Sequence, residues 1–395
     1  MKLFKWLLFL FIALNLLIVI SGKTYLYKGV ANTYLQGRST ADIDEYKIFE
    51  NRIVKNSDVV QEWSRAKVYN QTKIPTKYIA DMERMQTIAY VVIKDDSIRH
   101  EEYWSGYGDT SHTGSFSMAK SIISILVGIA IEEGKIKTLD EPISDFLPEY
   151  KEGDKSKITI RHLLTMSSGI DFDESYSNPL GFAAEAYYGS DLRKLIFKYG
   201  IKSEPGKNFE YLSGNTQLLG FILKEATGLS VSEYASQKLW TPIHAKQNAY
   251  WSLDHEDGDE KAYCCFNSNA LDFARIGKLY LDSGRWNGNQ IVPAKYVLES
   301  LKPAPLMDEG SQNKRFGYSW WLLPNYSSSF EGKKLYNIFY ARGVLGQYII
   351  VIPELKMIIV RLGKHREKEA LNGHPIDLYW YIDAALEMYP NNNIN

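Results

Sequence analysis

The sequence predicts an α/β protein of the α+β type, in which an antiparallel sheet is flanked by helices and carries an inserted, mostly helical domain. Two groups of short apolar or alternating runs, at residues 87–108 and after residue 310, predict strands. The chain between them has mostly helical patterns, and residues 114–134 are apolar almost all the way round, as in a helix buried on every side. Strands from both ends can therefore share one sheet, with the buried helix between the sheet and the inserted domain.

The chain of 395 residues is long enough for two domains. We expect residues 1–22 to form a signal peptide or membrane anchor and residues 23–84 to form an N-terminal extension that joins the fold. Residues 85–134 and 311–395 would form the α/β sheet domain, and residues 135–310 the inserted helical domain.

The N-terminal segment has the composition of a targeting signal. Lys2 and Lys5 precede the apolar run of residues 6–20, and Ser21 and Gly22 follow it. The run is intermediate in length between a signal-peptide core and a full membrane span. Its small flanking residues permit cleavage, but there is no Ala-x-Ala sequence and no lipid-attachment cysteine. We expect an exported protein, membrane-anchored if the segment is retained and periplasmic or secreted if it is cleaved, with a slight preference for the anchor.

Further elements are expected in chain order. Residues 87–108 predict two strands joined by a turn at residues 94–97, and the pattern predicts no other strand before the C-terminal part of the chain. Helices are expected near residues 162–166, after Tyr211 and within residues 269–284. The late strand runs are residues 316–323, 334–343, 346–353 and 356–363, and the closing helix is residues 375–389.

Charge composition and missing motifs argue against several classes of function. Lys and Arg (46) balance Asp and Glu (47) without a long run of one sign, which argues against a nucleic-acid partner. The sequence contains no Gly-x-Ser-x-Gly elbow and no Gly-rich phosphate loop, which argues against an ordinary α/β-hydrolase and against an NTPase. No cofactor is expected.

Cysteine and histidine give no sign of a metal site. The seven histidines are scattered, and no His-x-x-x-His pair occurs on an expected helix. The two cysteines are the neighbours Cys264 and Cys265. Adjacent cysteines rarely have the geometry for a mutual disulfide, and two ligands are too few for a structural zinc ion. We therefore expect both to be buried, small apolar residues.

A serine and a lysine stand three residues apart at the head of the apolar helix. Positions i and i+3 lie above one another on a helix, so the Lys120 ammonium can reach the Ser117 hydroxyl. The unpaired N–H groups and the dipole of the helix N-terminus would favour negative charge at Ser117. Ser-x-x-Lys also occurs at Ser64 and at Ser311, but neither copy leads into an apolar helix. A helix N-terminal serine beside a lysine, without chemistry, is the alternative.

Three segments carry a resemblance to a known family. They are SMAK at residues 117–120, YLSGNTQLLG from Tyr211, and ARGVLGQYIIVIPE at residues 341–354. In this order they resemble the Ser-x-x-Lys, Tyr-x-Asn and third-strand motifs of the β-lactamase and penicillin-recognising serine hydrolases, in particular the class C-like members. Together with LLTMSSGI, EPGKNFEY and the Cys-Cys-Phe segment, the resemblance covers most of residues 85–385 and is nearest to 6-aminohexanoate-dimer hydrolases.

The resemblance implies acyl transfer. Ser117 would be the nucleophile and Lys120, desolvated on the buried helix, its base. Tyr211 would relay the proton to the leaving group and later activate water. The backbone N–H groups of Ser117 and of Val344, just after Gly343, would hold the oxyanion.

Two departures from the family pattern concern the substrate. Ser213 stands where Tyr-x-Asn has its amide, although Asn215 lies nearby. The Lys or His of the third motif falls on Ala341, with Arg342 beside it. Recognition of penicillin-like acids is therefore not implied, whereas reaction at the serine is unaffected.

Three further residues have an alternative interpretation. Gly346 is a substrate-side glycine by resemblance and a turn glycine by its neighbours. Tyr176 either lines the pocket or packs at the surface, and Tyr211 has core packing as its alternative.

The leading hypothesis is an exported serine hydrolase that cleaves a small-molecule amide or ester through an acyl-enzyme on Ser117. A non-turnover sensor or cell-envelope binding protein of the same fold is the alternative. The membrane would be a partner only through the N-terminal segment.

Overall fold

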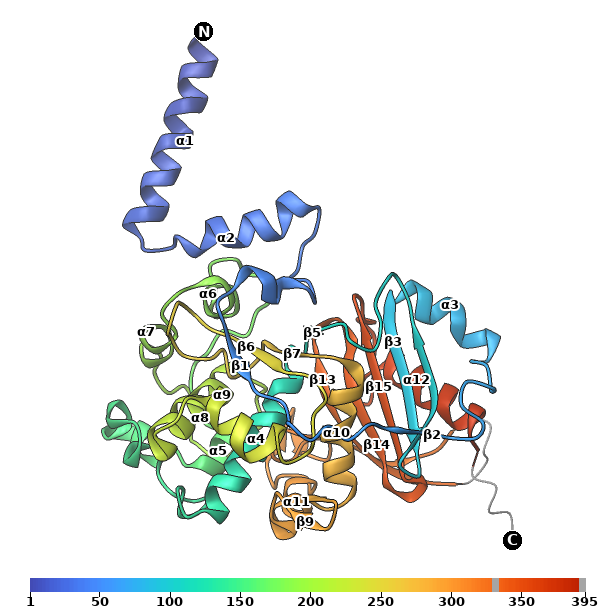
Figure 1. Ribbon diagram of the computed structural model, residues 1–395. Coiled ribbons are helices and arrows are strands. Elements are labelled where there is room, and N and C mark those ends of the chain that lie inside the picture. The colour runs from blue at the N-terminus through green and yellow to red at the C-terminus, as the bar shows by residue number, and fades with distance from the viewer. Residues whose placement is uncertain (329–333, 391–395) are drawn as a thin grey trace.

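The computed structural model describes residues 1–328 and 334–390. Its centre is a seven-stranded sheet in the order β12-β13-β14-β15-β3-β4-β2 (Figure 1). All neighbours are antiparallel except β2, which runs parallel to β4. Strands from both ends of the chain share this sheet, as the sequence predicts. The strands are β2 (Ser64–Arg65), β3 (Thr87–Lys94), β4 (Ser97–Tyr103), β12 (Trp321–Tyr326), β13 (Tyr336–Gly343), β14 (Gln347–Ile352) and β15 (Met357–Gly363).

The sheet is covered by helices on both faces, which explains its nearly continuous apolar strands. Val91 of β3 packs into the core on one face, and Tyr90 and Val92 pack into the core on the other, following the two-residue period of a strand. Figure 1 shows the layers on either side of the sheet. The first face is covered by α4 (Met118–Glu132) and α10 (Ala270–Leu281), and the second by α3 (Thr76–Arg84) and α12 (Ile376–Met388).

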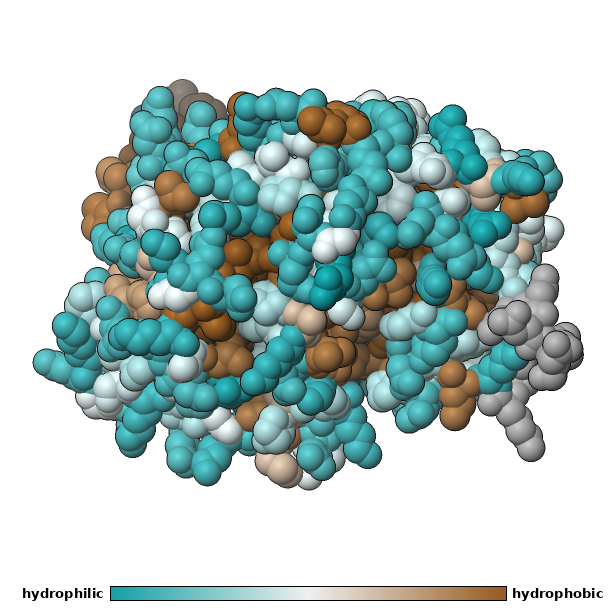
Figure 2. Space-filling model, turned by 60° about the horizontal axis from the view of Figure 1, so that its bottom comes forward, coloured by the Kyte–Doolittle hydropathy of each residue, from teal (hydrophilic) through white to brown (hydrophobic). Residues whose placement is uncertain are grey.

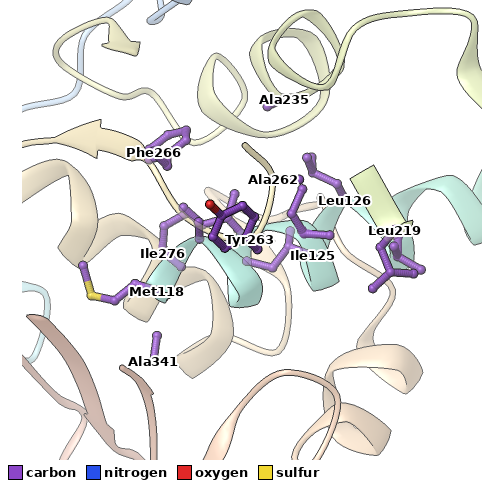
Figure 3. Close-up of a cluster of buried hydrophobic side chains, with 14 of the residues drawn as sticks. Met118, Ile125, Leu126, Leu219, Ala235, Ala262, Tyr263, Phe266, Ile276 and Ala341 are labelled. Atoms are coloured by element: carbon purple, nitrogen blue, oxygen red, sulfur yellow. The ribbon is translucent and has the colours of Figure 1, made fainter. Parts of the chain in front are cut away.

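Helix α4 is the predicted central helix. Every residue from Met118 to Ala130 is buried. Its side chains meet Leu219 of α8 (Ser213–Thr227), Ile276 of α10 and Ala341 of β13 in one apolar cluster (Figure 3). Since a fully buried aliphatic side chain stabilises a fold by about 1.5–3 kcal/mol, this helix is a main source of cohesion between the sheet and the middle of the chain.

A second, four-stranded sheet corrects the expectation that the middle region lacks strands. Its order is β1-β6-β7-β5, all antiparallel. Strands β6 and β7 lie within residues 135–310, and they are too short to show a period of two in the sequence. Strand β5 leads directly into α4. The strands are β1 (Asn51–Val54), β5 (Thr113–Gly114), β6 (Ala249–Ser252) and β7 (Phe266–Ser268).

Shorter elements complete the middle region. The helix expected near residues 162–166 lies slightly earlier in the chain, and the helices expected after Tyr211 and within residues 269–284 are present as α8 and α10. The additional elements are α5 (Ile160–Leu164), α6 (Phe182–Tyr188), α7 (Leu192–Phe197), α9 (Val231–Ala235), α11 (Ala294–Ser300), β8 (Arg285–Trp286) and β9 (Asn289–Gln290).

The two cysteines correct a second expectation. Cys264 and Cys265 are buried, as expected, but they form a disulfide with each other. Cys265 has a φ of +65°, in the left-handed region that side-chain-bearing residues seldom adopt. The turn is held by the Trp251 indole N–H, which donates to the Cys264 carbonyl at 3.0 Å, and by Asn267, whose side-chain amide donates to the Cys265 carbonyl at 2.7 Å. Trp251 lies in β6, 13 residues from Cys264 in the sequence, whereas Asn267 is only two residues from Cys265. The sequence does not reveal the left-handed backbone at Cys265, because no glycine or asparagine stands at that position.

The N-terminal segment forms α1 (Lys2–Ile20), which stands away from the rest of the molecule and has no buried residue (Figure 1). Its length and composition would allow it to cross a membrane, and a signal sequence has the same properties. The face at the opposite end of the molecule is covered mostly by hydrophilic side chains, with hydrophobic atoms showing mainly in the recess between them (Figure 2).

The buried His374 makes the stability of the fold depend on pH. Its Nδ1 lies 2.6 Å from the Tyr340 hydroxyl. Burial, with Arg342 and Arg315 adding to it, lowers the pKa of His374 to about 4. The unfolded chain takes up this proton near the ordinary pKa of about 6.5. Between these values only the unfolded state is protonated, so stability should be full above pH 6.5 and fall by up to about 3 kcal/mol towards pH 4.

Substitution of His374 by Asn tests this expectation, because the amide can still bond to Tyr340 but does not titrate. Urea unfolding at pH 4.5 and 7.5 should show a smaller loss of stability at low pH for the variant than for the wild type. Equal losses in the two proteins would contradict the assignment.

Candidate active site

Ser117 and Lys120 lie together at the start of α4. The chain leaves β5 through Phe116, whose φ of +44° makes a sharp, left-handed turn into the helix. Ser117 occupies the N-cap position and is partly exposed, whereas Lys120 is only 1% exposed. The Lys120 ammonium donates to the Ser117 hydroxyl at 2.8 Å. The partly exposed Ser117 is thus hydrogen-bonded to the amine of Lys120, which is buried away from water.

The Lys120 amine has two further acceptors. Its Nζ donates to the Ser213 hydroxyl at 3.0 Å and to the Tyr263 carbonyl at 2.9 Å. The ring centroids of Tyr211 and Tyr263 lie 5.2 Å and 5.6 Å from Nζ. Within residues 1–328 and 334–390 no carboxylate forms an ion pair with Lys120. The amine is therefore held by neutral oxygens and aromatic faces only.

Glu174, which the sequence analysis did not identify, completes this group. Its carboxylate accepts hydrogen bonds from the Ser213 hydroxyl and from the Ser213 backbone N–H, the latter at 2.8 Å. Ser213 is the first residue of α8, so the negative charge also lies at the positive end of a helix dipole. A continuous chain of hydrogen bonds thus links Glu174 to Lys120 through Ser213. The only sign in the sequence was the nearness of Glu174 to Tyr176.

Tyr176 joins the same chain from the outside. The residue is 61% exposed, and its hydroxyl donates to Glu174 at 2.7 Å. It therefore lies at the surface end of the site, next to solvent. Asn215, in contrast, is completely buried and donates to the Met166 sulfur at 3.6 Å. Its role as a substrate contact stays a prediction, and its side chain is not open to solvent in this structure.

Two tyrosines lie near Lys120, and their surroundings differ. Burial, with the charge of Glu174 adding to it, raises the pKa of Tyr263 well above its ordinary value, so this phenol stays protonated. Tyr211 is only half-buried, and its ring packs against Trp321 at 5.3 Å and Phe316 at 5.9 Å. Its hydroxyl has no hydrogen bond to Lys120 or Ser117, both of which the structure describes. Tyr211 thus forms an aromatic wall of the site, next to the amine.

The end of β13 approaches the nucleophile closely enough to require glycine. A Cβ on Gly343 would lie 2.2 Å from the Ser115 carbonyl oxygen, two residues before Ser117. Val344 follows at once, in a tight turn where Leu345 and Gly346 have φ of +64° and +79°. The backbone of Gly343 and Val344 is therefore brought beside the N-terminus of α4.

Buried side chains brace this turn from behind. Arg361, 0% exposed, donates to the carbonyls of Leu345 at 2.9 Å and Gly346 at 2.7 Å. The Gln347 amide donates to the Val344 carbonyl at 3.1 Å and to the Gly363 carbonyl at 2.6 Å. Every carbonyl of the turn therefore has a buried partner, which fixes the orientation of its peptide groups. The sequence does not predict these contacts of Arg361, because in the sequence it is simply one polar residue within an apolar strand.

The chain is similar to known proteins in both sequence and fold. The sequence is 25% identical over 324 residues to the 6-aminohexanoate-dimer hydrolase of Paenarthrobacter ureafaciens, covering 77% of this chain and 79% of the relative. A Bacillus anthracis structure provisionally assigned as a 6-aminohexanoate-dimer hydrolase superposes with a TM-score of 0.75 and 23% identity, covering 88% of this chain and 93% of the other.

A more distant structure has the same fold. The D-stereospecific amidohydrolase from a Streptomyces species superposes with a TM-score of 0.57 and 16% identity, covering 76% of this chain and 93% of the other. The beta-lactamase family model matches residues 76–375, which include both the Ser117–Lys120 pair and the glycine turn. The chain therefore belongs to the beta-lactamase family.

Proposed function

We propose that this protein is a serine hydrolase that cleaves an amide or ester bond through an acyl-enzyme on Ser117. The observation that carries the proposal is the set of three acceptors around Lys120. In its uncharged form the amine has two N–H groups and one lone pair. The Tyr263 carbonyl can only accept, and the Ser213 hydroxyl uses its proton on Glu174. These two oxygens take both N–H groups, so the lone pair is directed at the Ser117 hydroxyl, as a general base requires.

The reaction follows from this geometry. As the Ser117 oxygen attacks the substrate carbonyl carbon, its proton passes to Lys120, and the carbonyl oxygen becomes an oxyanion. The N–H groups of Ser117 and Val344 are suited to bind that oxyanion, because the glycine turn lies against the start of α4. The bond to the leaving group then breaks, and the leaving group takes up a proton by way of Lys120 or Tyr211. Water releases the acyl group by the reverse sequence.

The relatives suggest the class of bond. The names of the proteins compared above refer to an amide dimer and to an amidohydrolase. The aromatic wall of Tyr211 and Trp321, with the Arg342 guanidinium 3.6 Å from the Trp321 ring centroid, offers stacking surface and one positive charge beside the site. We propose a small amide or ester as the substrate. We also propose that α1 attaches the protein to a membrane after export.

Removal of the nucleophile tests the reaction. Ser117→Ala should lower hydrolysis of a p-nitrophenyl ester by at least about 10³-fold, and Lys120→Ala should lower it by about 10²–10⁴-fold. Intact mass after treatment with a fluorophosphonate should show one adduct on the wild type and none on Ser117→Ala. Ser64→Ala, which alters another Ser-x-x-Lys copy at an exposed strand, is the matched control and should keep full activity. Unchanged hydrolysis by Ser117→Ala would refute the proposal.

Glu174 should act as a positioning residue. Glu174→Gln allows the Ser213 hydroxyl to turn its proton towards Lys120, which disturbs the directed lone pair, so kcat should fall by about 10- to 100-fold. Glu174→Asp should restore part of the rate, because its carboxylate can still accept the proton of the Ser213 hydroxyl. A lower Tm for both variants, with no recovery of kcat by Glu174→Asp, would indicate a structural role only.

Gly343→Ala tests the glycine turn. The added methyl group would collide with the Ser115 carbonyl and push the turn away from Ser117, so kcat should fall by about 10²–10³-fold, as for loss of an oxyanion donor. Gly200→Ala, whose Cβ would meet nothing within 4 Å, is the matched control. Equal kcat values for the two variants, both folded by circular dichroism, would remove the turn from the mechanism.

A further inference from the structure

A regular apolar stripe faces outward on the segment after α1. Helix α2 (Tyr25–Asn32) exposes Tyr27, Val30 and Ala31, at the spacing of one helix face, and the 3-10 helix η1 (Tyr34–Gln36), which follows a break in the helix at Thr33, exposes Tyr34 and Leu35. The exposures are 42% for Tyr27, 42% for Val30, 60% for Tyr34 and 75% for Leu35, which is unusual for four large side chains on one short segment. The outer stripe consists of Tyr27, Val30, Ala31, Tyr34 and Leu35.

The opposite face of α2 is the one that binds the body of the protein. Tyr25 and Thr33 are buried, and Gly29 lies 3.2 Å, measured from its ideal Cβ position, from the ring of Tyr188 in α6. The contact with the protein is therefore complete without the outer stripe. The stripe has no covering element in the described residues, so another apolar phase is needed to remove it from water.

Helix α1 indicates what that phase is. The Tyr27 hydroxyl donates to the Asn15 side chain of α1 at 2.8 Å, so the stripe faces the side on which α1 stands. Figure 1 shows α2 lying between α1 and α6, across the end of α1. Residues 1–41 contain no Asp or Glu, and Lys23 and Lys28 follow α1. Arg38 is instead engaged in ion pairs with Asp42 and Glu45 of the protein. Such a segment suits a surface of anionic lipid headgroups.

We propose that the outer stripe lies in the membrane–water interface, with α1 crossing the bilayer beside it. The proposal rests on the membrane attachment through α1 that was proposed above. Tyrosine suits this depth, because its ring is apolar and its hydroxyl can remain hydrated. The partner is a lipid bilayer, and α2 is its docking surface on the folded part of the protein.

The start of the N-terminal segment is also hydrogen-bonded to a loop of the active site. The Tyr25 hydroxyl donates to the Pro179 carbonyl at 3.2 Å, and Lys23 donates to the Leu180 carbonyl at 3.5 Å. Both carbonyls belong to the loop that carries Glu174 and Tyr176. The side of the site formed by this loop is therefore next to the bilayer, and it is tied to the interfacial helix by two hydrogen bonds.

Site-directed spin labelling of the full chain in phosphatidylcholine–phosphatidylglycerol vesicles tests the proposal. Labels at Val30→Cys and Leu35→Cys should show more frequent collisions with oxygen and fewer with a water-soluble nickel chelate than a label at Leu298→Cys. Leu298 is a matched control, since it is 58% exposed and lies on α11, at the end of the molecule opposite α1 (Figure 1). Cys264 and Cys265 are bonded to each other and do not take the label without a reductant.

Equal, water-like collision rates at the three positions would overturn the proposal. Water-like rates with spin–spin broadening at position 35 would also overturn it, because they would assign the stripe to a second copy of the chain. Leu35 is mostly exposed, so its label keeps the test valid if the change at Val30 disturbs α2. No substrate is used, so the result does not depend on whether the proposed hydrolysis occurs.

Discussion

The hydrogen bonds of one buried amine join three distant segments of this molecule, and their geometry depends on the packing of the whole fold. Lys120 belongs to α4, Ser213 begins α8, and Tyr263 precedes the disulfide turn that leads into β7. These three segments are far apart in the sequence and meet at one nitrogen atom. The second, four-stranded sheet and the packing of α4 against α8 are what bring them together. A shift in either would misdirect the amine long before it unfolded the protein.

A second buried lysine shows that burial alone does not bring an amine to a serine hydroxyl. Lys261 is completely buried, its Nζ bonds to the Tyr187 carbonyl, and burial lowers its pKa well below the ordinary value. Its Nζ lies 3.8 Å from the ring centroid of Phe49, and among the described residues it forms no hydrogen bond to a serine hydroxyl. Lys120 differs in having the hydroxyl of a partly exposed serine at one of its three bonding positions. In the proposed reaction the chemistry therefore depends on which oxygen occupies that position, where α4 supplies Ser117.

The sequence predicted those parts of the protein that depend on local pattern. The two strand groups, the apolar central helix and the spacing of Ser117 and Lys120 all express a helix or strand period. Glu174 and Arg361 could not be predicted, because each acts through partners more than ten residues away, at Ser213 and at the turn after Gly343. The Cys264–Cys265 disulfide was missed because it needs a left-handed backbone at Cys265, and the Trp251 indole that helps to hold this turn comes from β6. Long-range hydrogen bonds leave no period in a sequence.

The two sides of the site differ in how they are fixed. The glycine turn is held from behind by Arg361 and Gln347, both fully buried in the sheet domain, so its position follows from the core itself. The loop of Glu174 and Tyr176 is held instead by Ser213 on one side and by Tyr25 and Lys23 on the other. The glycine turn is therefore fixed by the sheet, whereas the side that orients Lys120 is linked to the N-terminal segment. In the proposed mechanism, whatever holds that segment in place would act on Lys120 through Glu174 and Ser213 and would leave the turn after Gly343 unchanged.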